Sequence, residues 1–178
     1  MMKPRVLLDS KHLEITITRL CSQLIETHND FSETVILGLQ PRGIYLAKRI
    51  QQKIQEILKR DDIHCGCLDT TFHRDDFRQK ELVPNSTEIN FIIEGKNVIL
   101  VDDVLYSGRT IRAGLDAMLA FGRPNLVELL VLVDRRWSRH LPIQAKYVGK
   151  TIDSIAAEKV NVAWKEIDGE DKVTLLEV

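Results

Sequence analysis

Two adjacent acids, Asp102 and Asp103, follow an apolar run over residues 98–101 that predicts a buried strand. Ligands of open α/β sheets bind beyond the carboxyl ends of the strands, so we expect both carboxylates at a binding site. Carboxylates in this position accept hydrogen bonds from a cis-diol or hold a hydrated magnesium ion. Either chemistry suits a ribose, and the acids alone do not choose between them.

A short polar segment a few positions later has the composition of a phosphate-binding loop: Tyr106, Ser107, Gly108, Arg109 and Thr110. It leads into a predicted helix and supplies free N–H groups, hydroxyl groups, a glycine and the positive end of a helix dipole. It has neither the P-loop pattern nor the Gly-x-Gly-x-x-Gly pattern, which disfavours those two nucleotide-binding classes. The alternative is an ordinary turn. The complete string over residues 98–110 favours a ribose 5-phosphate site.

The elements that must position these groups follow from the hydrophobic pattern. Nearly continuous apolar runs at residues 34–39, 97–101 and 126–133 predict buried parallel strands. Helical spacing predicts helices from the cap residues Asp9 and Ser10 to about His28, over residues 44–58 and over residues 109–121. Further strands are expected over residues 63–72, 144–148, 159–164 and 172–176, the last three without a helix between them. This order predicts one α/β domain over residues 1–178 with a mainly parallel sheet.

The segment over residues 73–90 is polar and has almost no periodicity. An irregular stretch of this length inside a compact domain is more often functional than incidental, so we predict a mobile binding loop. The alternative is a surface insertion without a function.

The bulk composition predicts one soluble, cytoplasmic domain. The 178 residues carry 25 Lys and Arg against 26 Asp and Glu, so nucleic-acid binding would require a local basic patch. Three cysteines without an apolar leader favour a reduced compartment. No apolar run approaches the roughly 20 residues of a membrane span.

Residues 98–110 resemble the phosphoribosyl diphosphate (PRPP) motif of type I phosphoribosyltransferases. The resemblance extends over most of the chain to the PyrR family of pyrimidine operon attenuators and uracil phosphoribosyltransferases, through residues 38–48, 68–76, 98–114, 132–135 and 141–150. It implies a type I phosphoribosyltransferase fold, with a central, mainly parallel sheet flanked by helices. It also implies a flexible lid loop over residues 72–90, and a small C-terminal hood with closing strands over residues 140–178.

The resemblance implies transfer of phosphoribose from PRPP to uracil, giving UMP and diphosphate, with Mg²⁺ on the diphosphate. Asp102 and Asp103 would be catalytic, holding the ribose hydroxyls and reaching Mg²⁺ mostly indirectly, through PRPP. The 5-phosphate would lie on Tyr106, Ser107, Gly108, Arg109 and Thr110. Arg42 would also be catalytic, because its planar guanidinium pairs two diphosphate oxygens at once. The implied diphosphate-binding residues are Gln40, Pro41, Arg42, Gly43, Arg74, Asp134 and Arg135.

Three of these positions carry more specific expectations. Family members have a strained, often cis, peptide in the diphosphate turn, and Gln40-Pro41 becomes cis at low cost, so we predict strain or a cis bond. Related purine enzymes have an acid at the position of Tyr106, so this tyrosine favours a pyrimidine. Uracil would be read by backbone groups near Val148 and Gly149, under the hood. A buried structural role beside an acid is the alternative for Arg135.

The resemblance also implies a second activity, in which the UMP-bound protein captures the leader mRNA of a pyrimidine operon. The implied RNA contacts are Thr18, Arg19, Arg139 and Lys150, whereas Ser22 and Gln144 replace a histidine and an arginine of the family pattern. A dense basic cluster, with Trp137 available to stack on a base, supports this role; it comprises Arg135, Arg136, Arg139 and His140. The alternative for the cluster is a solvated turn or a subunit contact.

Two further alternatives remain at this point. In the first, the chain is a UMP-responsive RNA-binding attenuator with little or no enzyme activity. In the second, it is a phosphoribosyltransferase for another base, such as orotate or a purine. Family members assemble as dimers and larger rings, so we expect a homo-oligomer.

Overall fold

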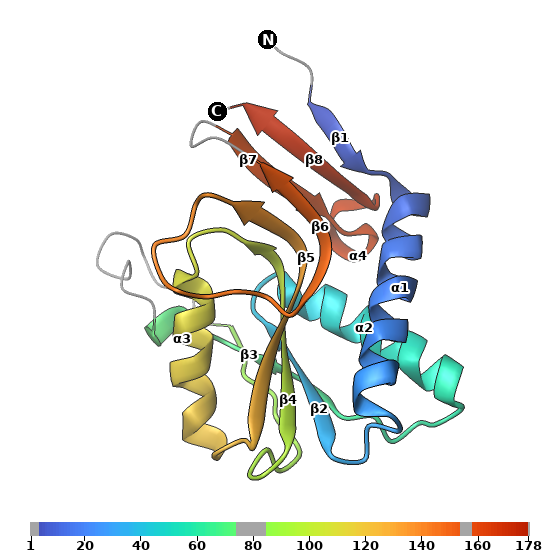
Figure 1. Cartoon of the computed structure of the whole chain (residues 1–178), viewed down its shortest axis with the longest axis vertical. Coiled ribbons are helices and arrows are strands. Elements are labelled where there is room, and N and C mark those ends of the chain that lie inside the picture. The colour runs from blue at the N-terminus through green and yellow to red at the C-terminus, as the bar shows by residue number, and fades with distance from the viewer. Residues whose placement is uncertain (1–3, 74–84, 154–157, 178) are drawn as a thin grey trace.

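Five parallel strands form the central sheet, in the order β3-β2-β4-β5-β6 (Figure 1). The computed structural model describes residues 4–73, 85–153 and 158–177. The strands are β2 (Thr34–Leu39), β3 (Cys65–Leu68), β4 (Asn97–Leu105), β5 (Leu126–Arg136) and β6 (Tyr147–Asp153). The predicted α/β class with a parallel sheet is therefore confirmed, and β2 has the predicted bounds.

Helices cover both faces of this sheet (Figure 1). The structure has α1 (Ser10–His28) and α2 (Gly43–Leu58) on one face and α3 (Arg109–Met118) on the other. Strand side chains alternate between the two layers, so that Ile36 and Ile99 pack with the first pair of helices, and Leu37 and Leu100 pack with α3. The α1 boundaries match the prediction, whereas α3 ends earlier and continues as a short 3-10 turn, η3 (Leu119–Phe121).

A second, antiparallel sheet lies above the carboxyl end of the main sheet and forms the hood. It has the order β1-β8-β7, with β1 (Arg5–Leu8), β7 (Glu158–Ala163) and β8 (Lys172–Glu177), and a short helix, α4 (Lys165–Asp168), lies between β7 and β8. The expectation of no helix there was wrong. The first strand was not predicted, because β1 has only four residues and depends on pairing with β8 at the other end of the chain.

The predicted boundaries of several strands change in the structure. The strand expected over residues 63–72 is limited to β3 (Cys65–Leu68), because its pairing with β2 covers only these residues and Thr71–His73 form a 3-10 turn. β4 and β5 continue to Leu105 and Arg136, since they still pair beyond the apolar runs, as in the pair Asp102 and Val131. The strand expected over residues 144–148 is displaced, because β6 begins at Tyr147 and belongs to the central sheet rather than to the hood. Among the described residues, none of the helices combines the length and the apolar character that a membrane span requires.

Candidate active site

The two acids lie within β4 rather than after its end. Asp102 is only 8% exposed, and its Oδ1 accepts the N–H of Asp103 at 2.9 Å. Oδ1 of Asp103 accepts the N–H of Val104 at 2.8 Å. Burial raises the pKa of Asp103 above its usual range, against the opposing effects of the Val104 N–H group and the Arg42 charge. The main chain thus orients both carboxylates, and the proton affinity of Asp103 is increased.

The phosphate loop, residues 106–110, connects β4 to α3. Gly108 precedes the helix with φ +89°, a left-handed conformation that glycine adopts without a steric penalty. The hydroxyl of Ser107 accepts the N–H of Arg109 at 3.4 Å, and the N–H of Arg112 donates to the carbonyl of Gly108 at 3.0 Å. The N–H groups that begin α3 therefore border the loop, as an anion site at a helix N-terminus requires.

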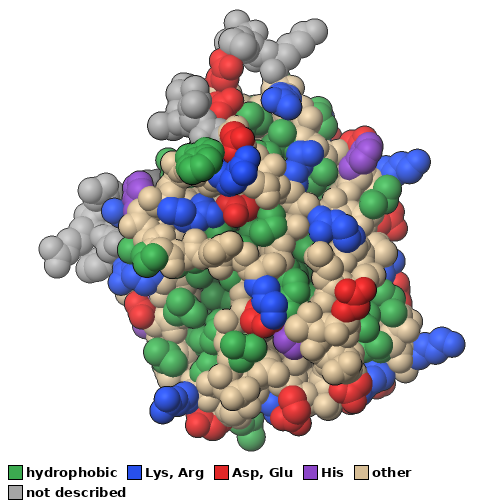
Figure 2. Space-filling model, in the orientation of Figure 1, with side chains coloured by type: hydrophobic (Ala, Val, Ile, Leu, Met, Phe, Trp, Pro, Cys, Tyr) green, Lys and Arg blue, Asp and Glu red, His purple; other side chains and the backbone are tan. Residues whose placement is uncertain are grey.

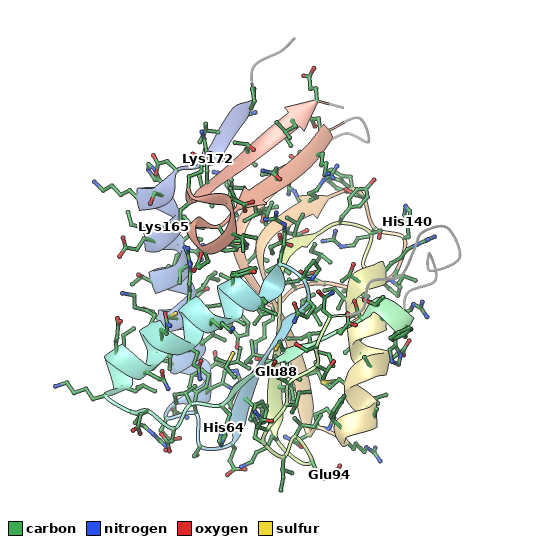
Figure 3. The ribbon with its side chains drawn as sticks, turned by 180° about the vertical axis from the view of Figure 1, so that it is seen from behind. His64, Glu88, Glu94, His140, Lys165 and Lys172 are labelled. Carbon is green, nitrogen blue, oxygen red and sulfur yellow. The ribbon has the colours of Figure 1, made fainter. Side chains whose placement is uncertain are left out.

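A cavity of about 350 Å³ lies over this loop and brings Asp102, but not Asp103, together with the predicted phosphate-binding residues. Its lining residues are Asp102, Val104, Leu105, Tyr106, Ser107, Gly108, Arg109, Thr110, Ile111 and His140. Sequence reasoning placed His140 only in the basic cluster. Its N–H donates to the carbonyl of Ser107 at 3.0 Å, and its side chain lies beside the start of α3 (Figure 3). No local pattern indicates this position, since the contact joins β4 to the segment after β5.

The diphosphate turn, residues 40–43, lies directly against the acid pair. The Gln40-Pro41 bond is cis, as predicted. A Cβ atom added to Gly43 would lie 2.5 Å from the carbonyl oxygen of Val101 and 2.9 Å from the Cα atom of Asp102. Glycine is thus the residue that permits this contact between the start of α2 and β4.

The side chain of Arg42 extends to the hood. Its guanidinium donates to the carbonyl of Val162 at 2.7 Å and forms an ion pair with Asp168 at 3.0 Å. The same carboxylate accepts the N–H of Trp164 at 2.9 Å. The Arg42 guanidinium and this N–H lower the pKa of Asp168. Asp168 was not singled out from the sequence, because only the tertiary fold brings α4 over the diphosphate turn.

Arg135 and Asp134, both expected at the diphosphate, make other contacts. Arg135 is 5% exposed, donates to the carbonyl of Glu158 at 2.8 Å and lies 4.2 Å from the ring centroid of Tyr106. These contacts match the alternative structural role, a buried guanidinium held by internal partners. Asp134 forms an ion pair with Arg139.

The backbone expected to read the base is already partly occupied. Arg19 of α1 donates to the carbonyls of Val148 and Gly149, at 3.3 and 2.6 Å. The C=O groups of these two residues therefore face α1.

The structure describes the two ends of the lid, residues 72–73 and 85–90. Thr71 and Asn85 donate their N–H groups to the carboxylate of Asp69, at 3.1 Å each. Further along, the N–H of Glu88 donates to the carbonyl of Cys67 at 2.9 Å, so this end lies along β3. Arg74, the predicted diphosphate ligand, lies outside the described residues.

The basic cluster is largely neutralised. Arg136 forms a bidentate pair with Asp153 at 2.7 and 2.8 Å, while Arg135 is buried and Arg139 is paired with Asp134. Trp137 is 85% exposed, and its Nε1–H group donates to Asp153 at 3.2 Å. Acidic and basic side chains also alternate over the face in Figure 2.

The candidate RNA contacts Thr18 and Arg19 are exposed on α1, and Lys150 is half-buried on β6. They lie on elements other than the segment that contains Arg139. The structure thus distinguishes Arg139 from the exposed Thr18 and Arg19, because its side chain is half-buried and paired with Asp134.

The acid pair fits a magnesium ion carried by a substrate. Mg²⁺ commonly keeps several waters and binds one or two carboxylates together with substrate phosphates. In the described ranges, no group of three or more His, Cys, Asp or Glu side chains gathers as a metal site. Asp102 and Asp103 therefore suit a magnesium ion that binds one or two carboxylates, with substrate oxygens supplying the other ligands.

Comparison with known proteins agrees with this geometry. Residues 6–167 match the family described as the phosphoribosyl transferase domain. The chain is 44% identical to the "Bifunctional protein PyrR" of Elusimicrobium minutum over 174 residues, which cover 97% of this chain and 96% of the relative. The protein of the same name from Desulfosudis oleivorans is 46% identical over 177 residues, which cover 98% and 97%.

Solved structures share the fold at low sequence identity. The hypoxanthine phosphoribosyltransferase of Trypanosoma cruzi has a TM-score of 0.74 at 14% identity, over 97% of this chain and 96% of its own. That of Staphylococcus aureus has a TM-score of 0.69 at 20% identity, over 97% and 92%. With the near-complete match to the curated relatives, the chain belongs to the PyrR family of type I phosphoribosyltransferases.

Proposed function

We propose that the protein transfers phosphoribose from PRPP to uracil, giving UMP and diphosphate. The observation that carries this proposal is the cavity in which Asp102 and the start of α3 lie together, with acceptors for ribose hydroxyls and donors for a phosphate. Among the relatives, the name "Bifunctional protein PyrR" is consistent with it.

In this proposal the substrate spans two sites that the fold joins at β4. Ser107, Gly108, Arg109 and Thr110 bind the 5-phosphate, while Asp102 and Asp103 accept hydrogen bonds from the ribose hydroxyls. The diphosphate lies toward the turn at residues 40–43, because Gly43 contacts Asp102. Mg²⁺ bound to the diphosphate would neutralise charge on the leaving group.

The reaction exchanges two bonds at the anomeric carbon. The bond from N1 of uracil to this carbon forms, the bond to the diphosphate oxygen breaks, and the N1 proton is released. Donors at the diphosphate stabilise the charge that develops on the leaving group, and exclusion of water protects an oxocarbenium-like ribose from hydrolysis.

Arg42 changes partners in this scheme. Its guanidinium pairs with Asp168, so contact with the diphosphate requires that phosphate oxygens replace this carboxylate. Gln40, Pro41 and Gly43 contribute their backbone, and Arg74 would come from the lid. We assign Asp134 and Arg135 to the support of the site, because their side chains already have internal partners.

We also propose the base site by analogy with the family. The ring of Tyr106, which lies against the guanidinium of Arg135, forms one wall of the base site. Backbone groups near Val148 and Gly149 read the pyrimidine. Because Arg19 takes the two carbonyls, contact with the base would fall to the N–H groups and the neighbouring backbone.

Turnover tests the proposal most directly. The purified protein is assayed with uracil, orotate and hypoxanthine at fixed PRPP and Mg²⁺, and diphosphate release is measured. Uracil is expected to be the preferred substrate. Activity with orotate or hypoxanthine, without activity on uracil, would show instead that the protein is a phosphoribosyltransferase for another base.

The second candidate function is capture of a leader mRNA by a cytoplasmic homo-oligomer. The word "Bifunctional" in the relatives' names and the exposure of Thr18 and Arg19 favour it. Retention of leader RNA on a filter, with and without UMP, measures it. Binding through phosphates weakens steeply with salt, so retention that is independent of salt would contradict this function.

A further inference from the structure

Arg139 is surrounded by main-chain acceptors of the phosphate loop and of its own segment. Its Nη1 donates to the carbonyls of Tyr106 at 2.5 Å and Leu105 at 3.2 Å. The same nitrogen lies 3.0 Å from the carbonyl of Arg135, and Nε donates to the carbonyl of Ile143 at 3.1 Å. Four carbonyl groups therefore point at one guanidinium, two of them at the end of β4 where the loop begins.

An ion pair completes this arrangement. Nη2 of Arg139 binds Oδ1 of Asp134, and the two side chains are only 22% and 14% exposed. A guanidinium has five donors in a rigid plane, and here all three nitrogens have acceptors. Arg139 can therefore reach an external phosphate only by releasing carbonyls that position the loop.

The same segment touches the loop at two more points. The N–H of His140 donates to the carbonyl of Ser107 at 3.0 Å. A Cβ atom added to Gly108 would lie 3.2 Å from Ile143 and 3.6 Å from Leu141. Residues 139–143, which we term the brace, thus follow the phosphate loop from Leu105 to Gly108.

A neighbouring arginine provides the contrast. Arg136 is 52% exposed and pairs with Asp153 of β6 at 2.7 Å, with no bond to the phosphate loop among its described contacts. In the sequence, Arg136 and Arg139 are equivalent members of one basic cluster. Of these two arginines, Arg139 alone has described contacts with the phosphate loop.

We propose that Arg139 is a positioning residue for the 5-phosphate loop, acting through the carbonyls of Leu105 and Tyr106, with Asp134 orienting its guanidinium. The inference rests on the proposed function only in taking this loop as the ribose 5-phosphate site. It assigns Arg139 to substrate binding instead of RNA contact.

The expected effect is large and selective. Loss of Arg139 removes the donor that these carbonyls share and leaves Asp134 without its counter-ion, so the loop relaxes from its binding geometry. A displacement of about 1 Å at a binding group costs on the order of a hundredfold in rate. Binding of the phosphate should weaken, whereas binding of uracil should change little, because the ring of Tyr106 is still held by the guanidinium of Arg135.

The experiment compares Arg139→Lys, Arg139→Ala, Asp134→Asn and Arg136→Ala in the full chain. Ribose 5-phosphate affinity is measured by calorimetry, the KM values for PRPP and uracil by turnover, and folding by circular dichroism and Tm. Lysine can still pair with Asp134 but cannot reach the carbonyls of Leu105 and Ile143 at the same time. Both Arg139 variants should bind ribose 5-phosphate at least tenfold more weakly, and Asp134→Asn about threefold to tenfold.

Selectivity distinguishes positioning from a general structural role. The PRPP KM of Arg139→Lys should rise with the Kd for ribose 5-phosphate, while its uracil KM stays within twofold. Arg136→Ala should match the wild type in every measurement. The inference would be overturned if folded Arg139→Lys bound ribose 5-phosphate as tightly as the wild type. It would also be overturned if that variant failed to fold, or if reduced filter retention of RNA were its only defect.

The two proposals fail in different ways. If the wild type binds ribose 5-phosphate but does not turn over uracil, the proposed base is wrong and the positioning test still stands. If the wild type does not bind ribose 5-phosphate, the phosphate site itself is wrong and both proposals fall.

Discussion

The Cα atom of Gly43 faces Asp102 so closely that an added methyl group would lie 2.9 Å from the Cα atom of that acid. The same methyl group would lie 2.5 Å from the carbonyl oxygen of Val101. Real Cβ atoms do not approach backbone atoms this closely, so the first turn of α2 and the acid pair form one rigid unit. The turn at residues 40–43 and the acid pair, which are far apart in the chain, are thereby set relative to each other.

Gly43→Ala should therefore damage both stability and substrate binding. Overpacking of this kind typically costs about 1–3 kcal/mol in the free energy of unfolding. Displacement of the acid pair should also raise the KM for PRPP. Denaturant unfolding and steady-state kinetics measure the two effects.

Gly114→Ala is the matched control, because its added methyl group meets the end of the Leu39 side chain, which can rotate. This glycine also lies inside α3, where alanine is favoured by roughly 1 kcal/mol. Its loss of stability should be smaller and its KM for PRPP unchanged. Equal effects of the two substitutions would argue against a special role for the Gly43 contact.

Asp103→Asn should weaken the use of PRPP without unfolding the protein. The amide keeps the shape of the side chain but loses the charge that strengthens a hydrogen bond to a ribose hydroxyl. Hydrogen bonds to charged groups contribute about 1.5–3 kcal/mol, which corresponds to roughly ten- to hundredfold in kcat/KM. Undiminished kcat/KM for PRPP in a folded variant would refute the proposed ribose contact.

The pH dependence of kcat/KM for PRPP should depend on the same carboxylate. Burial raises the pKa of Asp103, so the group takes up its proton at a higher pH than an exposed aspartate. Activity is therefore present above the raised pKa and is lost as the pH falls through it. The substrate phosphates titrate equally for both proteins, so the difference between wild type and Asp103→Asn isolates this group. An acidic limb of the pH profile at the ordinary aspartate pKa would contradict the assignment of this limb to Asp103. So would an acidic limb that persists in Asp103→Asn.

Tyr106 should contribute to the choice of base. Its ring lies 4.2 Å from the guanidinium carbon of Arg135, and Tyr106→Asp would replace this stacking with an ion pair and open the wall of the site. We expect the ratio of kcat/KM for uracil over hypoxanthine to fall at least tenfold. Tyr106→Phe keeps the ring on Arg135 and should preserve the ratio. Identical ratios in all three proteins would remove Tyr106 from the specificity determinants.

Tyr147→Phe should reduce stability and leave catalysis unaffected. The Tyr147 hydroxyl donates to Glu128 at 2.7 Å and lies 3.2 Å from His28, in a buried cluster near the amino ends of β5 and β6. Removing the hydroxyl leaves a buried carboxylate with one donor fewer, a loss of about 1–3 kcal/mol. Urea unfolding should show this loss, with unchanged kinetic constants for PRPP and uracil. A change in KM would mean that the two ends of the sheet are coupled.

The parts of the fold that were predicted correctly depend on residues close together in the chain. The apolar run of β2 and the capped, amphipathic α1 were predicted at their observed bounds. The acid pair and the phosphate loop occupy one continuous segment, so their proximity needs only a strand that leads into a helix. Errors occurred where pairing with distant strands decided the outcome, at β1 and β6.

The basic cluster illustrates what a local pattern cannot resolve. Three arginines within five positions have the same side chain, yet Arg135 lies under Tyr106, Arg136 pairs with Asp153 and Arg139 holds the phosphate loop. Their partners come from the phosphate loop, from β5, β6 and β7 and from the segment after β5, and a local pattern does not show which of them lies nearest. The cluster that the sequence offered as an RNA contact, a solvated turn or a subunit contact is thus three arginines with different partners within the chain.

The sequence by itself determined which groups form the core of the site, since the acids, the glycine and the helix start at residues 98–110 are adjacent and their types favour a ribose phosphate. Only the tertiary structure decided which other side chains serve that site. It joined Gly43 to Asp102, Arg42 to Asp168 and Arg139 to Tyr106. The physical reason is that hydrophobic periodicity and turn propensity act over a few residues, whereas burial and ion pairing depend on which surfaces the packed layers bring together.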